Sequence, residues 1–174
     1  MIAEVPSPPS TKEPCAPSPP SCVRPESSTP SQRDRSRPAL LDDLGLAAAL
    51  DHLAQECTHN AAVPVRFRAE GSTDALPHVA NTVLFRIAQE ALTNIERHAH
   101  ASCVDITLVR DGRKVVLTIA DNGSGFDPAV VASHPKRGIG LRNMMERMDA
   151  IGGQLKIVST PAGTSVQASV EAEA

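Results

Sequence analysis

Apolar residues recur at helical spacing in three segments of this chain, 39–56, 77–99 and about 139–151. On a helical wheel, each segment gathers its apolar residues on one face. The stripes consist of Leu46, Ala49, Leu50 and Leu53 in the first segment, Leu84, Ile87, Ala88, Ala91, Leu92 and Ile95 in the second, and Leu141, Met144, Met145 and Met148 in the third. The pattern therefore predicts three amphipathic helices, each with one face against a core.

The other segments with apolar periodicity have the alternation or the composition of β-strands. They are residues 63–70, 103–110, 114–120, 154–159 and 164–170. Asp111-Gly112 joins the second and third strands and is a strong signal for a tight hairpin. With the helices interleaved, this order predicts an α+β fold, a two-layer α/β sandwich with one mixed sheet and its helices on one face.

The first 38 residues differ from the rest of the chain in composition. They contain ten of the 15 prolines and no glycine, and they show no apolar period. A segment of this kind buries too little apolar surface to offset its chain entropy. We therefore expect residues 1–37 to form a disordered Pro/Ser-rich tail, with a polyproline ligand for a partner as the alternative, and the ordered chain to begin at Pro38.

Charge and residue usage exclude several classes of function. The net charge is −3 and aromatic residues make up 2% of the chain, so the chain lacks both the basic footprint and the stacking surface of a nucleic-acid-binding protein. No apolar run is long enough to span a membrane, and the N-terminus lacks the features of a secretory signal. The four cysteines form no CxxC pair. We expect a soluble, cytoplasmic protein with reduced thiols and no direct contact with nucleic acid or membrane.

Polar residues on the second predicted helix form a ladder beside its apolar stripe. Glu90, Asn94 and His98 follow one another at a spacing of four residues, roughly 90° from the middle of the stripe. This position is the rim of the core, where we expect a cleft between helix and sheet. An Asn94 oxygen suits Mg²⁺, and Glu90 could hold a metal-bound water or accept a proton. His98 and Arg97 could meet phosphate charge, and a solvated helix flank is the alternative for the whole ladder.

The turn after the strand 114–120 carries a second set of candidate residues. Asp121 stands at the end of this strand and begins the sequence DNGSG. Its carboxylate can accept a hydrogen bond from the 6-amino group of adenine, whereas guanine presents an acceptor at the same place. Gly123 and Gly125 would let the backbone approach a ligand closely, although an ordinary turn has the same composition.

The segment GIGL, residues 138–141, opens the third predicted helix. A glycine pair at a helix N-terminus leaves backbone N–H groups aimed at an anion, and the helix dipole favours negative charge there. The segment lacks the third glycine of a dinucleotide fingerprint, and the chain contains neither a P-loop nor an HExxH motif. Gly163-Thr164, at the start of the last strand, is by itself only a turn.

The order and spacing of these motifs resemble those of a known family. QEALTNIERHA, DNGSGFD, RGIGLRNMMERM with IGGQL, and PAGTSV resemble the N, G1 and G2 boxes and the closing Gly-Thr of the GHKL (Bergerat-fold) ATP-binding domain. The variant is similar to that of sensor histidine kinases in the DesK-like, nitrate-sensor-like group. The likeness covers about residues 37–170, and RPALLDDLGLAAAL resembles the segment that joins the dimerisation helices to this domain. It implies a joining helix over 38–60, a remnant of the dimerisation region, and an ATPase domain over 61–174.

The resemblance implies a role for each candidate residue. Asn94 would coordinate the Mg²⁺ that bridges the phosphates of ATP, Glu90 would support its water shell, and His98 would lie near the phosphates. Asp121 would accept from the adenine amino group, and Thr164 would support the adenine site through water. The residues implied to shape the adenine pocket or to wrap the phosphates are Gly123, Gly125, Gly138, Ile139, Gly140 and Leu141.

The activity that the resemblance implies is transfer of the ATP γ-phosphate to a protein histidine in two-component signalling. Two departures bear on it: the final turn, TPAGTSV, is about one residue shorter than the usual form, and the acceptor box, a histidine followed by an aspartate upstream, is missing. We therefore expect a protein-histidine kinase that uses ATP and Mg²⁺ and that is truncated or acts in trans. Its partners would be a response regulator or a histidine-bearing dimerisation hairpin of another chain. The alternatives are a non-catalytic nucleotide-binding docking module and an anti-sigma-type serine kinase.

Overall fold

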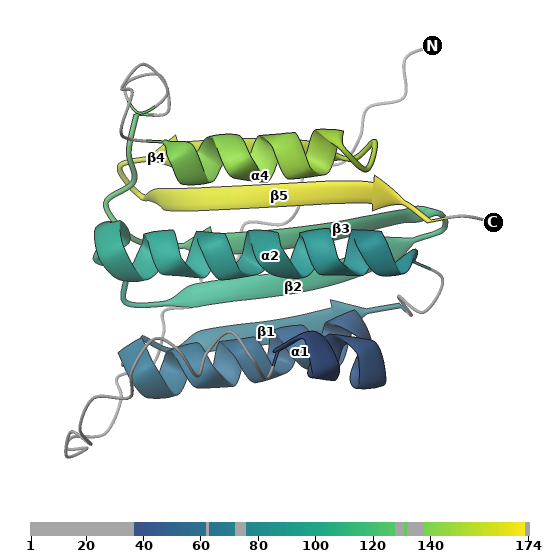
Figure 1. Ribbon diagram of the computed structural model, residues 1–174. Helices are drawn as coiled ribbons and strands as arrows, with labels where there is room; N and C mark the ends of the chain where they lie inside the picture. The colour runs from purple at the N-terminus through teal and green to yellow at the C-terminus, as the bar shows by residue number, and fades with distance from the viewer. Residues whose placement is uncertain (1–36, 62, 72–75, 128–130, 132–137, 173–174) are drawn as a thin grey trace, which may run out of the picture.

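The computed structural model describes residues 37–61, 63–71, 76–127, 131 and 138–172. Within these residues, helices cover one face of a five-stranded mixed sheet (Figure 1), which confirms the predicted α+β sandwich. Residues 1–36 of the predicted tail lie outside this part of the chain, and Arg37 begins the first helix. No helix among the described residues has both the length and the apolar character that crossing a bilayer requires.

The sheet is mixed because one pair of its strands is parallel. In spatial order it contains β1 (Val65–Glu70), β2 (Val104–Asp111), β3 (Lys114–Asp121), β5 (Gly163–Glu171) and β4 (Gln154–Thr160). β1 pairs parallel to β2, and the other neighbours pair antiparallel. The predicted hairpin is present, since Asp111 pairs with Lys114, and Gly112 between them has a φ of 57°.

Apolar and polar residues alternate along the strands, so one face of the sheet is apolar, and this face packs against the helices. Its buried residues are Val104, Ile106, Leu108, Val115, Leu117, Ile119, Val166, Ala168 and Val170. The intervening residues, such as Thr107, Thr118 and Gln167, lie on the opposite face. The hydrophobic core therefore lies between the sheet and the helices.

Helix α1 (Arg37–Ala61) packs against β1 and against helix α2 (His78–Asn94). Gly45, with a φ of 79°, interrupts the helical geometry and kinks the element. Beyond the kink the predicted apolar stripe is buried, as expected for Leu46, Ala49, Leu50 and Leu53. The helix is longer than the predicted 39–56 at both ends, and its apolar stripe joins the same core as the sheet.

Helix α2 (His78–Asn94) lies over the middle of the sheet and continues into one π-helical turn, η1 (Ile95–Ala99) (Figure 1). Its predicted stripe is buried except at Ile95, which is half-buried and packs against the core. The sequence pattern gives the extent of the helix but not the wider last turn, because apolar spacing does not distinguish one π-helical turn from an α-helical one. His100 follows with a φ of 51°, the left-handed conformation that often ends a helix.

Helix α4 (Ile139–Asp149) covers the β4 edge of the sheet. Met144 and Met148 are buried, and Leu141 is half-buried. The predicted burial of Met145 is wrong, because this side chain is 47% exposed. At this edge only a narrow stripe of the helix meets the sheet, and Met145 is turned by about 100° from Met144 around the helix axis.

Leu50→Ala should lower the free energy of unfolding by about 2–5 kcal/mol, because truncating a fully buried side chain leaves a cavity. Urea unfolding of the full chain measures this loss. Leu44→Ala is the matched control on the same helix: its side chain is 62% exposed. The control should change the free energy of unfolding by less than about 0.5 kcal/mol. Equal effects of the two substitutions would contradict the packing of α1 into the core.

Candidate functional site

Three polar residues stand in a row across one end of the sheet. Ala120 pairs with Ser165, so Asp121 and Thr164 come next to each other at the following step, and Ser159 pairs with Thr164. All three continue the positions that face the helices, since Asp121 and Ser159 follow Ile119 and Ile157 by two residues on their strands and Thr164 precedes Val166 by two. The end of the apolar face is therefore polar on three neighbouring strands.

Asp121 is held by a turn that leaves part of its carboxylate unused. Its Oδ1 accepts a hydrogen bond from the Gly123 amide at 2.7 Å. Its Oδ2 accepts no hydrogen bond from any residue that the structure describes, and the side chain is half-buried. The next residue, Asn122, fastens the turn to the start of β2, because its Oδ1 accepts from the amides of Ser102 (2.9 Å) and Cys103 (3.0 Å). The carboxylate is thus oriented and retains acceptor capacity.

Gly123 and Gly125 allow close approach, but of the protein's own backbone. A Cβ on Gly123 would collide with the carbonyl of Ala99, and a Cβ on Gly125 would collide with the carbonyl of Thr160. Gly125 also has a φ of 62°, which disfavours other residues. The sequence-based interpretation assigned this freedom to ligand contact; in the structure it lets the loop after β3 pack between η1 and the β4–β5 hairpin.

Ser159 is the site residue that sequence reasoning missed. Its Oγ accepts a hydrogen bond from the Phe126 amide at 2.8 Å and lies 2.9 Å from the Thr164 hydroxyl. Thr164 is therefore linked through Ser159 to the loop that carries Gly125. The sequence contains one signal for this role: along β4, Ser159 occupies the position where the alternation of Leu155 and Ile157 calls for an apolar residue.

On α2, the structure separates the predicted polar ladder into two parts. Glu90 and Asn94 are half-buried on the α-helical segment, at the rim of the core as predicted. Neither side chain has a hydrogen bond or an ion pair among the described residues. His98 and Arg97 are exposed and belong to η1. Each residue of a π-helix turns the chain by fewer degrees than a residue of an α-helix. A spacing of four residues therefore does not place His98 in line with Glu90 and Asn94.

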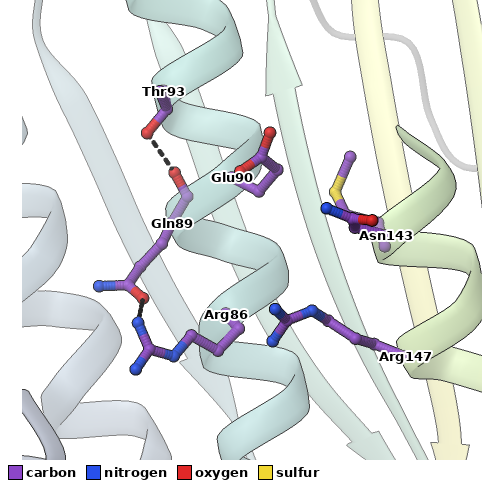
Figure 2. A pocket seen from close by; sticks show the side chains of 7 residues that line it. Arg86, Gln89, Glu90, Thr93, Asn143 and Arg147 are labelled. Carbon is purple, nitrogen blue, oxygen red and sulfur yellow. Dashed lines mark hydrogen bonds between the residues drawn. The ribbon is translucent and has the colours of Figure 1, made fainter. Parts of the chain in front are cut away.

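The cleft beside Glu90 lies between α2 and α4, not between helix and sheet as predicted. It has a volume of about 270 Å³ and is lined by Arg86, Gln89, Glu90, Thr93, Asn143, Met144 and Arg147 (Figure 2). Apolar side chains of α2 pack on the sheet, and the cleft described beside Glu90 opens on the side of the neighbouring helix. A Cβ on Gly140 would collide with Glu90 Oε1, so the missing side chain of Gly140 makes room for this carboxylate.

The N-terminus of α4 presents backbone donors next to Glu90. Gly138 precedes the helix with a φ of 84°, and no side chain caps it. The first-turn amides of an α-helix, here those of Ile139, Gly140 and Leu141, have no partner within the helix and favour an anion. Ile139 is 53% exposed and Leu141 is half-buried. The predicted basic neighbours Lys136 and Arg137 lie outside the described residues.

All of these residues fall within one family match. Residues 80–174 match the family described as histidine kinase-, DNA gyrase B-, and HSP90-like ATPase. This chain belongs to that family. The resemblance to the ATP-binding domain of a histidine kinase is thereby confirmed, and the match includes each candidate residue from Glu90 to Thr164.

Its relatives include sensor kinases that are several times longer. The chain is 45% identical to the sensor histidine kinase MctS of Rhizobium johnstonii over 132 aligned residues, and this alignment covers 76% of this chain and 29% of MctS. It is 38% identical to the signal transduction histidine-protein kinase/phosphatase UhpB of Salmonella typhimurium over 137 aligned residues, and this alignment covers 78% of this chain and 26% of UhpB. The chain thus spans between a quarter and a third of the length of these relatives.

Solved structures confirm the fold. The histidine kinase domain of the blue-light activated histidine kinase EL346 from Erythrobacter litoralis matches with a TM-score of 0.57 at 20% identity, covering 72% of this chain and 64% of that domain. The histidine kinase AdeS of Acinetobacter baumannii matches with a TM-score of 0.57 at 14% identity, and the match covers 82% of this chain and 77% of the AdeS chain. At these identities the likeness concerns the fold alone.

Ser159→Ala should lower the free energy of unfolding by about 1–2 kcal/mol, because it leaves the Phe126 amide without its acceptor. Thermal or urea unfolding measures the loss, and hydrogen exchange at the Phe126 amide should become faster. Ser165→Ala is the matched control on the neighbouring strand, since its hydroxyl has no hydrogen bond among the described residues. Unchanged exchange at Phe126 in Ser159→Ala would contradict the role given to this hydroxyl.

Proposed function

We propose that this chain binds ATP with Mg²⁺ in the space that runs from Asp121 to the first turn of α4, and that it transfers the terminal phosphoryl group to a histidine of another chain. One observation carries the proposal: polar groups of the required kinds, which have no partner among the described residues, follow one another along α2 and at the start of α4. From the Asp121 end they are Asn94 and Glu90 on α2, and then the first-turn amides of α4 beside Glu90. Phosphoryl transfer needs mainly positioning and neutralisation of charge, and such an order supplies both.

The Asp121 end suits adenine. The carboxylate is oriented by the Gly123 amide and keeps Oδ2 as an acceptor. The 6-amino group of adenine donates to such an oxygen, whereas the 6-carbonyl of guanine would face it with a second acceptor. Thr164 and Ser159 stand beside Asp121 on the same face of the sheet and would form part of the surface that adenine contacts.

The Glu90 end suits phosphates and Mg²⁺. No group of three His, Cys, Asp or Glu side chains placed to hold a metal ion occurs among the described residues. A magnesium ion here would depend on the Asn94 amide oxygen together with water and phosphate oxygens, a ligand set that Mg²⁺ accepts. Bound Mg-ATP supplies the phosphoryl group and the cation that offsets its charge. The amide of Asn94, which is half-buried and has no hydrogen bond within the described part of the chain, fits this use.

Glu90 is placed to serve the acceptor. Its carboxylate lies against the first turn of α4, where the amides would hold the terminal phosphate. A histidine that attacks phosphorus through one ring nitrogen must lose the proton of the other, and a carboxylate beside the reacting group can accept it. The same carboxylate would support the water shell of a bound Mg²⁺, and the two uses are compatible.

The partner and the location follow from this activity. We propose that the phosphorylated histidine belongs to a dimerisation hairpin of another chain and that a response regulator receives the phosphoryl group afterwards, in the cytoplasm. Residues 38–60 act as the helix that joins the ATPase domain, 61–174, to a dimerisation region. The packing of Leu46 and Leu50 into the core supports a fixed attachment of this helix to the domain.

Asn94→Ala should reduce phosphoryl transfer at least tenfold, because it removes the side-chain oxygen proposed for Mg²⁺. The measurement is acid-labile ³²P on an acceptor hairpin from a related histidine kinase, after incubation with the full chain and Mg-[γ-³²P]ATP. Asn60→Ala, which removes an exposed amide on α1, is the control and should label normally. ATP binding without label on the hairpin would contradict the kinase proposal and favour a docking module.

Asp121→Asn should abolish the preference for ATP over GTP, because a pure acceptor becomes a group that also donates. Affinity for ATP should fall about tenfold or more, the usual loss for a hydrogen bond to a charged group. Competition binding with both nucleotides measures the ratio. Asp111→Asn, at the opposite end of the strand pair, is the control. A mutant that retains full selectivity would show that Asp121 does not contact the base.

A further inference from the structure

The β4 edge of the sheet carries main-chain groups that pair with no strand the structure describes. β4 is the last strand of the sheet, and β5 is its neighbour on the inner side. Thr160 and Gly163 flank a two-residue turn and form a hydrogen-bonded pair, and such pairs alternate with open pairs along an antiparallel ladder. Every second residue of β4 therefore directs its N–H and C=O groups away from β5. These outward residues are Leu155, Ile157 and Ser159.

The two edges of the sheet differ in how well they exclude a further strand. On its outer face β1 is charged at every second residue, at Arg66, Arg68 and Glu70, and such charges discourage pairing along an edge. β4 contains a single charged residue, Lys156, and no proline. Two positions further along, the side chain of Val158 is 47% exposed. The β4 edge therefore suits a strand that places an acidic residue and an apolar residue opposite these two.

Helix α4 presents an apolar side chain above the same edge. Asn143 and Arg147 line the cleft on the side of α2 (Figure 2). Successive helical residues turn by about 100°, so Met145 is turned by about 200° from Asn143 and lies on the flank of α4 away from α2. Because α4 contacts β4, this flank lies on the side of the open edge. A strand added to β4 would cover the exposed Met145.

The place of α4 excludes a second β4 as the added strand. Neighbouring strands lie about 4.8 Å apart, whereas packed helices need about 8–10 Å between their axes. Because α4 lies over β4 (Figure 1), a second copy that paired through its own β4 would bring its α4 into collision with this one. The edge therefore suits an extended segment without a covering helix. Residues of that segment beside Leu155 and Ile157 would be apolar, and one on the outer face would be acidic, opposite Lys156.

The first five residues of this chain have this pattern. They are MIAEV, the longest mainly apolar stretch without proline in residues 1–36. We infer that residues 1–5 add to β4 as an antiparallel strand of the same molecule. In the register that we assign, Ala3 pairs with Ile157, so that their main-chain groups bond to each other. The side chains that would lie toward α4 and Met145 are those of Met1, Ala3 and Val5.

The outer face of β4 selects this direction and register. Glu4 lies opposite Lys156, and Ile2 lies opposite Val158, which gives one pair of opposite charge and one aliphatic pair. A shift by two residues in either direction separates both pairs, and a parallel strand cannot form the two together. Pro6 follows at a position whose nitrogen points away from β4, where a missing N–H costs no hydrogen bond.

Residues 6–36 are long enough to bring this segment to β4. Arg37 begins α1, which packs against β1 at the opposite edge of the sheet. The two edges of a five-stranded sheet lie about 20 Å apart. A disordered chain of that length, which is what the sequence predicts here, spans about 30 Å on average. Attachment within one molecule gives the segment an effective concentration in the millimolar range, so a short strand can stay bound.

Hydrogen exchange of single amides in the full chain tests this inference. The outward amides of β4 should exchange about tenfold or more slowly than unpaired amides. Ala3→Pro should remove this protection, because proline has no N–H to donate to β4. The β4 amides that bond to β5 should stay slow in both proteins. Ala16→Pro, the same substitution outside the segment, is the matched control and should leave all rates unchanged.

Exchanging the two charges tests the register. Glu4→Lys and Lys156→Glu should each speed up exchange at the Ile157 amide by up to about fivefold, and the two together should restore the original rate. Glu13→Lys is the control, an acidic residue of the first 36 that lies outside the segment, and it should have no effect. A double variant that exchanges as fast as the single variants would overturn the register.

Two further outcomes decide the inference as a whole. Fast exchange of the outward amides in the unsubstituted chain, or rates that Ala3→Pro does not change, would overturn it. The protection should be the same at all protein concentrations, and protection that rises with concentration would assign the segment to a second copy and overturn the placement within one molecule. None of these measurements involves a nucleotide, so their outcome is independent of the proposed function.

Discussion

Close contact between backbone segments at one end of the sheet is the constraint on which the site depends. At three positions an added Cβ would collide with a backbone carbonyl of another segment; these are Gly123, Gly125 and Gly163. The contacts bring together the end of η1, the loop after β3 and the β4–β5 hairpin. A backbone carbonyl cannot swing aside as a long side chain can, so each glycine is required for the segments to meet. The place of Asp121 beside Thr164 and Ser159 is a consequence of this packing.

Helix α2 relates that end of the sheet to the cleft. Its apolar stripe packs on the sheet and fixes the rotation of the helix, and Glu90 beside the stripe faces α4. Gly140 leaves room for the carboxylate of Glu90, which would have to move aside for a larger residue at this position. The ends that we propose for the base and for the phosphates are therefore related by one rigid element, which suits a reaction that depends on positioning.

Much of this arrangement could be predicted from the sequence. The apolar periods locate the helices and strands, and the Asp-Gly turn locates the β2–β3 hairpin, because local pattern and turn chemistry decide these features. Three features could not be predicted for physical reasons. The burial of Met145 depends on how far α4 overlaps the sheet edge, the π-helical turn depends on contacts of Ala99 with the loop after β3, and the role of Ser159 depends on pairing between β4 and β5.

The placement of Glu90 explains why such a site would depend on its metal. The first-turn amides and the helix dipole favour an anion at the N-terminus of α4, so Glu90 occupies the region that a phosphate would also favour. A triphosphate that enters without a cation meets like charge there, and the repulsion is not screened as it would be in bulk water. A cation held by the Asn94 amide, as we propose, would remove that repulsion and leave Glu90 beside the phosphate. The same carboxylate would then face the open side of the cleft, so the group that opposes a metal-free nucleotide would also be the group that meets the acceptor.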